Sequence, residues 1–217
     1  RNQRRELTTL DDDMIRAFMD AIKGNPYELL YLVALFTGLR QGELLGLTWS
    51  CVDFHQGTLL INKQIQKVQT SPKRYDYQLV PTKSRNSRTI TPAREVLTWL
   101  QRQRATQSEW RLRAGPAWQN DRDLVFTNEL GDCIKGHSIY CHFKRIMAKL
   151  GFPGARFHDL RHTYAVTAIR AGDDIKTVQE NMGHASASFT LNVYGYVTEQ
   201  MRRESSERME KFIQNLG

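Results

Sequence analysis

An imidazole and a guanidinium stand where they could act together on one phosphate group. His158 and Arg161 are three residues apart in a segment with helical periodicity, so their side chains share one helix face. The planar guanidinium can bind two phosphate oxygens, and the imidazole can donate or accept a proton. The spacing is common in proteins, and on its own a solvated helix surface explains it.

A second arginine follows directly on the most apolar segment of the chain. Arg40 comes after the run from Leu29 to Phe36 and precedes Glu43 by three residues. An arginine at the edge of a core has to be paired, and Glu43 is the natural partner at this spacing. The pair is either purely structural, or it orients an arginine that binds an anion.

Basic residues are concentrated in one part of the sequence. The chain has 31 Lys and Arg against 23 Asp and Glu, a net charge of +8. Between Asn62 and Arg104, ten basic residues are opposed by Asp76 and Glu95 only. Such a stretch is typical of a protein that binds a phosphate backbone, although a solvated basic face is the alternative. The candidate contacts selected from it are Lys63, Lys67, Arg85 and Arg88.

The composition indicates a globular protein from a reducing compartment. Apolar residues make up 40% and charged residues 25%, and no apolar run approaches the roughly 20 residues that span a bilayer. The three cysteines have no disulfide-like spacing. Cys133, His137, Cys141 and His142 lack a Cys-x-x-Cys pair, so no metal site is expected. The chain does not begin with Met and is interpreted as a fragment of a longer intracellular protein.

The elements that position these residues are expected to be mostly helices. Apolar residues recur at helical spacing between capping residues, glycines and prolines. The predicted helices cover residues 9–24, 26–38, 92 to beyond 100, 139–150, 157–171, 173–183 and 198–216. The segment 29–36 is apolar on nearly every side and should lie in the core.

Strand-like patterns occur in three places. They cover Thr58–Ile65, Tyr75–Pro81 and Arg88–Thr91, which leaves residues 83–87 as a polar hairpin tip. No repeat or convincing linker divides the chain. The sequence therefore predicts the α+β class, with residues 1–217 as a mainly helical single domain that has a small three-stranded antiparallel sheet.

Five segments together resemble one family, the tyrosine recombinases of the lambda-integrase type. In chain order they are Thr-Gly-Leu-Arg-Gln-Gly-Glu-Leu at 37–44, Pro-Thr-Lys-Ser at 81–84, His-Asp-Leu-Arg-His-Thr-Tyr-Ala at 158–165, Met-Gly-His at 182–184 and Thr-Leu-Asn-Val-Tyr at 190–194. Each is weak alone, but five in the right order and spacing make the resemblance specific. Met182 replaces the usual Leu, and the ten-residue gap from His184 to Tyr194 is similar to integrases of phages and conjugative transposons.

The resemblance implies a transesterification in which a tyrosine attacks a scissile phosphate, forming a 3′-phosphotyrosine and releasing a 5′-hydroxyl. The implied nucleophile is Tyr194, and His158 is the general base or holds the base in position. Arg40 and Arg161 would clamp the phosphate, His184 would donate a hydrogen bond to it, and Lys83 would be the general acid. Glu43 would orient Arg40 or its neighbours. Tyr196 is a close competitor of Tyr194. The implied chemistry needs neither ATP nor a metal.

The resemblance also implies partners. These are double-stranded DNA recombination sites, further copies of the chain in a tetramer on synapsed DNA, and an accessory directionality factor, with no membrane. Residues 198–217 are expected as a helix that docks on a neighbouring protomer, or alternatively on its own domain. The family's N-terminal core-binding and arm-binding domains are absent from these residues, and the expected location is the bacterial cytoplasm, for a bacterial or a phage-encoded protein.

Two other functions are compatible with parts of the pattern. A type IB topoisomerase shares the chemistry and relaxes DNA instead of recombining it. A non-catalytic DNA-binding module could use the helix pair 157–171 and 174–182 as a helix-turn-helix. That second interpretation leaves the placement of Arg40, Lys83 and Tyr194 unexplained.

Overall fold

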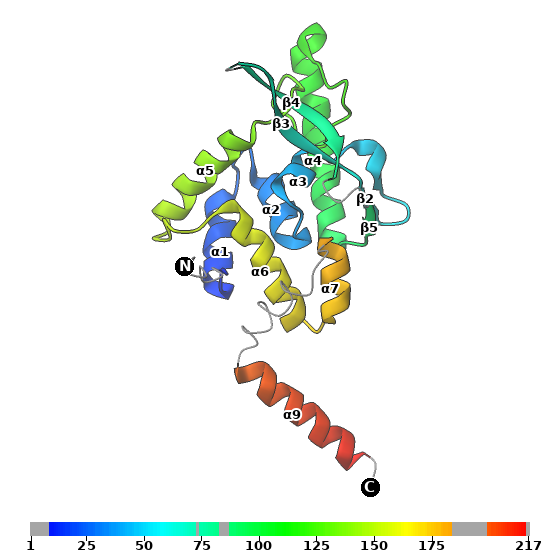
Figure 1. Ribbon diagram of the computed structural model, residues 1–217, viewed down its shortest axis with the longest axis vertical. Coiled ribbons are helices and arrows are strands. Elements are labelled where there is room, and N and C mark those ends of the chain that lie inside the picture. Colours follow the sequence, from blue (N-terminus) through cyan, green and yellow to red (C-terminus); the bar gives the residue numbers. More distant parts are fainter. Residues whose placement is uncertain (1–8, 73, 83–86, 184–198, 216–217) are drawn as a thin grey trace.

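The computed structural model describes residues 9–72, 74–82, 87–183 and 199–215. At its centre lies helix α2, Glu28–Thr37, most of whose residues are buried. Helices α1 (Asp12–Ile22), α4 (Arg94–Ala114) and α6 (Phe157–Arg170) contact it (Figure 1). The prediction that this apolar segment lies in the core is confirmed.

Of the remaining helices, those at residues 136–149, 175–182 and 199–214 were predicted and show small shifts at their ends, whereas the short helix at residues 41–45 and the two 3₁₀ turns were not predicted. These elements are α3 (Gln41–Leu45), α5 (Gly136–Lys149), α7 (Ile175–Met182), α9 (Glu199–Gln214) and the 3₁₀ turns η1 (Trp49–Cys51) and η2 (Gly115–Ala117). The first helix starts later than predicted, because Asp11 instead of Thr9 caps it. The Asp11 carboxylate accepts a hydrogen bond from the Met14 backbone N at 2.8 Å, and its negative charge suits the helix N-terminus.

The strands form two antiparallel sheets. Strand β2 (Thr58–Ile61) pairs with β1 (Val52–Asp53) on one side and with β5 (Arg88–Ile90) on the other. Strands β3 (Lys63–Ser71) and β4 (Arg74–Pro81) form a separate two-stranded sheet. Figure 1 shows this hairpin extending past α3 and α4. The predicted class, mainly helical with a small antiparallel sheet, is confirmed.

The pairing of these strands differs from the prediction in two ways. The predicted strand 58–65 is divided at Asn62: the residues before it pair with β1 and β5, and those after it pair with β4. The inside–outside alternation also ends there, since Gln64 and Ile65 are both buried. In the described chain β4 pairs with β3, and β5 pairs with β2. The segment between Pro81 and Arg88 therefore connects two sheets, and the hairpin predicted there is wrong.

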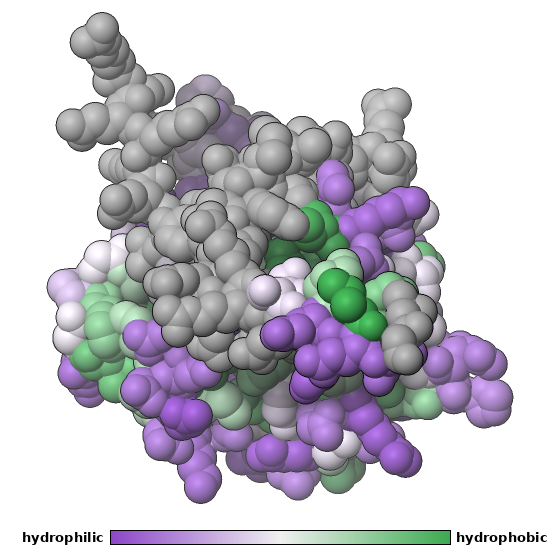
Figure 2. Space-filling view, turned by 90° about the horizontal axis from the view of Figure 1, so that it is seen from below, coloured by the Kyte–Doolittle hydropathy of each residue, from purple (hydrophilic) through white to green (hydrophobic). Residues whose placement is uncertain are grey.

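Helix α9 lies apart from the rest of the fold in Figure 1. Three of its apolar residues are largely exposed: Met209 at 59%, Phe212 at 59% and Ile213 at 61%. Viewed from the end where α9 lies, the described surface is largely hydrophilic with small apolar patches (Figure 2). In the described part of the chain, no helix has the length and apolar character needed to cross a membrane.

Candidate active site

The centre of the site is the buried carboxylate of Glu43, whose side chain is 2% exposed. Arg40 donates to it twice, from its backbone N to Oε2 at 3.0 Å and from Nη1 to Oε1 at 2.7 Å. Arg88, at the start of β5, donates from Nη2 to Oε2 at 2.7 Å and from Nη1 to Oε1 at 3.1 Å. The predicted pair of Arg40 and Glu43 is confirmed, and one carboxylate holds two guanidiniums.

The two arginines determine the ionisation of this carboxylate. Burial would raise the pKa of Glu43, but the hydrogen bonds and charges of Arg88 and Arg40 outweigh it and lower the pKa to about 2. Glu43 is therefore ionised at any pH at which the protein would act.

Replacing Glu43 with glutamine should lower the free energy of unfolding by about 3–5 kcal/mol, because two guanidiniums lose the charge that compensates them. Urea denaturation followed by circular dichroism measures the change. Asp13→Asn is a matched control, since Asp13 pairs with Arg16 at the same 2.7 Å distance but on the exposed surface of α1. That control should leave the denaturation midpoint unchanged.

The stabilisation by Glu43 should also depend on pH. Its folded pKa of about 2 lies below the ordinary 4.5, so the stabilisation is complete above pH 4.5 and is lost as the pH falls toward 2. The difference in stability between the wild type and Glu43→Gln should therefore shrink over this interval. A difference that stays constant from pH 5 to about 2 would contradict the ion-pair explanation.

The second arginine of the resemblance, Arg161, is buried inside the fold with 1% exposure. From α6, its Nη1 donates to the carbonyl oxygen of Gly38, and its Nη2 donates to that of Met182 at 2.5 Å. Gly38 ends α2 in the left-handed region, with φ of 63°, which turns its carbonyl toward the arginine. In the described chain, the buried Nε of Arg161 makes no hydrogen bond.

Positive charge is in excess around these groups. Burial, and after it the charge of Arg40, lowers the pKa of Arg161 to about 9. Among the described residues, one carboxylate compensates these three guanidiniums: Glu43 accepts hydrogen bonds from Arg40 and Arg88, and its charge acts on Arg161 without a hydrogen bond. A cluster with this charge and a buried donor without an acceptor is suited to bind an anion.

His158 lies in the first turn of α6, next to this cluster. Its side chain keeps an exposed edge, and its ring meets that of His162 edge-to-face at 4.7 Å. Desolvation, and after it the charge of Arg161, lowers the pKa of His158 below its usual value of 6.5. The imidazole is therefore neutral near pH 7 and can accept a proton. Burial also lowers the pKa of His162, to about 4.

Several predicted site residues lie outside the described part of the chain: Lys83, Arg85, His184 and Tyr194. Their roles stay predictions. Of the predicted DNA contacts, Lys67 is exposed on β3, with its amine 4.2 Å from the centre of the Tyr75 ring, and Lys63 is partly exposed. Arg88 instead turns inward to Glu43, and the basic pattern that selected it gave no sign of this ion pair.

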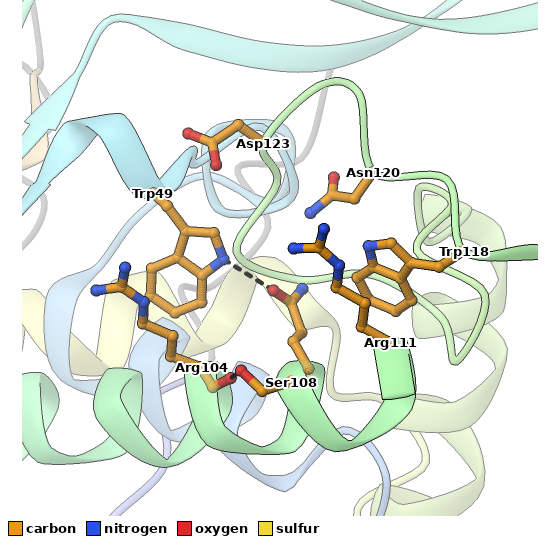
Figure 3. Close-up of a pocket in the computed structure, with 8 residues that line it drawn as sticks. Trp49, Arg104, Ser108, Arg111, Trp118, Asn120 and Asp123 are labelled. Carbon is orange, nitrogen blue, oxygen red and sulfur yellow. Dashed lines mark hydrogen bonds between the residues drawn. The ribbon is translucent and has the colours of Figure 1, made fainter. Parts of the chain in front are cut away.

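A hollow of about 320 Å³ occurs elsewhere, between η1, α4 and the loop after η2. Two indoles and two guanidiniums line it, and Trp49 Nε1 donates to Gln107 Oε1 at 2.8 Å (Figure 3). Of the predicted site residues that the structure describes, none lines this hollow.

Known proteins resemble this chain in both sequence and fold. The model of the phage integrase family matches residues 8–201. A "Tyrosine recombinase XerC-like" protein of Caldanaerobacter subterraneus is 34% identical over 94% of this chain and 54% of its own length. The ICEBs1 integrase of Bacillus subtilis is 27% identical over 86% of this chain and 49% of its own. The chain spans about half the length of these curated relatives.

Two solved structures share the fold. The Tn1549 transposon integrase, solved with transposon right end DNA, has a TM-score of 0.78 at 22% identity and covers 97% of this chain and 69% of its own. The XerA recombinase has a TM-score of 0.68 at 21% identity and covers 95% of this chain and 66% of its own. With the family model matching most of the chain, the resemblance to tyrosine recombinases is confirmed, and the chain belongs to the phage integrase family.

Proposed function

We propose that residues 1–217 form the catalytic domain of a site-specific recombinase, which integrates or excises a mobile element by cutting and rejoining DNA. The observation that carries this proposal is the arginine cluster around Glu43, with its excess charge and the buried Nε of Arg161, which makes no hydrogen bond to the residues that the structure describes. A scissile phosphate is the anion that fits it. The relatives' names, a tyrosine recombinase and integrases, support the same substrate.

The reaction exchanges one phosphoester for another. The phenol oxygen of Tyr194 bonds to the phosphorus, and the bond from phosphorus to the 5′-oxygen breaks. The phenol proton passes to His158, directly or through a group that it positions, and Lys83 protonates the leaving 5′-oxygen. A 5′-hydroxyl of another strand then reverses these steps and rejoins the DNA.

The phosphate carries more negative charge in the transition state than in the ground state, and the site is built to offset it. Arg40 and Arg161 would each donate to a non-bridging oxygen, and His184 would add a hydrogen bond. Glu43 keeps Arg40 in place for this task through the two hydrogen bonds described above. Because Arg40 and Arg161 are held by protein acceptors before DNA binds, little reorganisation of these two arginines opposes the reaction.

The proposed partners are double-stranded recombination sites in the bacterial cytoplasm, a directionality factor, and further copies of the chain in a tetramer. Lys63, Lys67 and Arg85 would contact DNA phosphates. Exposed Met209, Phe212 and Ile213 support docking of α9 on a neighbouring protomer.

Deleting residues 199–217 should therefore abolish assembly on paired DNA sites while the remaining domain still binds a single site. Sedimentation of the protein with DNA carrying one or two sites measures both properties. Assembly that is unchanged by the deletion would contradict docking between protomers.

Covalent capture of DNA tests the proposed function without knowledge of the target sequence. The chain is incubated with a pool of nicked duplexes that have a randomised core, in which cleavage releases a short strand and traps the adduct. Recombinase activity predicts adducts whose sequenced DNA shares a site. Failure to capture any DNA would favour a binding module, and relaxation of supercoiled plasmids without a shared site would favour a topoisomerase.

A further inference from the structure

Three arginines donate hydrogen bonds to the backbone at the end of α7. Three consecutive carbonyl oxygens each accept a hydrogen bond from a different one: Asn181 from Arg88 Nε at 2.7 Å, Met182 from Arg161 Nη2 at 2.5 Å, and Gly183 from Arg40 Nη2 at 3.0 Å. The last carbonyls of a helix lack intrahelical partners and carry partial negative charge. The arginine cluster therefore also fixes the end of the helix that precedes His184.

Arg88 differs from the other two arginines in how its nitrogens are used. Its Nε bonds to Asn181, and both its Nη atoms bond to Glu43, so each of its three nitrogens already has a protein acceptor. Three of its five N–H groups are thus engaged, one on each nitrogen, whereas Arg161 keeps its Nε without an acceptor in the described chain.

Arg88 also packs tightly against the residue that ends α7. Gly183 has a φ of 63°, in the left-handed region. A Cβ on Gly183 would lie 2.7 Å from Arg88 Nη1 and 3.1 Å from its Cδ. This close approach fixes where the chain leaves α7 toward His184.

The geometry points to Arg88 as a positioning residue for strand cleavage. It bonds on one side to Glu43, which holds Arg40, and on the other side to the end of α7. The Arg88 side chain thus fixes the position of Glu43 and Arg40 relative to the end of α7, from which the chain continues to His184 and Tyr194. This inference rests on the proposed function, and it replaces the predicted role of Arg88 as a DNA contact with a role in positioning Glu43 and the end of α7.

Arg88→Met should slow single-turnover adduct formation at saturating DNA about 10–100-fold, the range found when a residue that orients the ligands of a metal site is removed. The substrate is the nicked duplex captured from the randomised pool. Arg88→Lys should restore the rate only in part, because an ammonium cannot reproduce the planar bonds to Glu43 and Asn181. Arg16→Met, which removes an arginine from an exposed ion pair on α1, should keep the wild-type rate.

The salt dependence of DNA affinity distinguishes positioning from phosphate contact. Each lost phosphate contact reduces the slope of log K against log salt by about 0.9. In a Tyr194→Phe background, which prevents cleavage, Arg88→Met should leave this slope unchanged. A slope reduced by about 0.9 with an unchanged cleavage rate would identify Arg88 as a phosphate contact and overturn the inference.

A purely structural role gives a different result again. Arg88→Met would then lower the unfolding midpoint while the cleavage rate of the folded protein stays at the wild-type value, which also overturns the inference.

Carbon-13 NMR of the Glu43 carboxyl supplies a readout that needs no cleavage, and the pKa of this carboxyl should rise in Arg88→Met. If the wild type forms no adduct, the proposed function fails, and the NMR result still decides whether Arg88 organises Glu43.

Discussion

Tyr194→Phe should abolish the covalent adduct between this chain and DNA, whereas Tyr196→Phe should retain it. Phenylalanine keeps the ring but lacks the phenol oxygen that would bond to phosphorus, so no slower route to the adduct is left. The prediction assigns the nucleophile by spacing within the segment 190–194, because both tyrosines lie outside the described residues. Gel electrophoresis of the nicked-duplex reaction under denaturing conditions measures the adduct.

The paired variants make this result specific to one oxygen atom. They are chemically identical changes two residues apart, so a general effect on folding or DNA binding should appear in both. Binding to the intact duplex should be the same for both variants and the wild type. If only Tyr196→Phe loses the adduct, the nucleophile is Tyr196. If both variants still form the adduct, neither tyrosine alone is the nucleophile, and attack by a tyrosine of this segment is contradicted.

Local spacing predicted the part of the site that is close in sequence. Arg40 and Glu43 are three residues apart, and this spacing sufficed to predict their ion pair. The apolar run before Arg40 predicted that α2 is buried and that the arginine lies at its end. His158 and Arg161 were predicted on one helix, although the burial of Arg161 could not be read from a motif.

Contacts between distant segments could not be predicted in this way. Arg88 reaches Glu43 across 45 positions, and it looked like one more member of a basic stretch. The division of the first strand has a similar origin. Gln64 is buried because α3 and the glycine that follows it pack on β3, so closely that a Cβ added to Gly46 would lie 2.6 Å from the Gln64 Cα. A polar residue buried by a neighbouring element breaks the alternation on which strand prediction relies.

The acceptors around Arg40, Arg88 and Arg161 explain how three positive charges can lie close together before DNA binds. Glu43 neutralises part of the charge, and the backbone carbonyls of Gly38, Met182 and Gly183 accept hydrogen bonds from Arg161 and Arg40. These acceptors carry only partial charges, so they orient the guanidiniums without satisfying them fully. The arginines are therefore held in place and still favour a fully charged anion such as phosphate.

Arg161→Ala should reduce the single-turnover rate of adduct formation by about 10³-fold or more, the range found when an arginine that stabilises a phosphoryl-transfer transition state is removed. The loss follows from its position, because the side chain is 1% exposed and its Nε is a buried donor without an acceptor in the described chain. Arg161→Lys keeps the charge but loses the planar fork, so its rate should fall between those of the wild type and the alanine variant.

The rate has to be separated from stability, since Arg161 also donates to the carbonyls of Gly38 and Met182. Reactions are therefore run well below the unfolding temperature of each variant and expressed per folded molecule. Arg170→Ala is the matched control, because Arg170 lies on the same helix but pairs with Asp12 at 2.9 Å on the surface. It should retain the wild-type rate. An Arg161→Ala rate within tenfold of wild type would show that the scissile phosphate does not use this guanidinium, and the anion site would have to be sought at Arg40 alone.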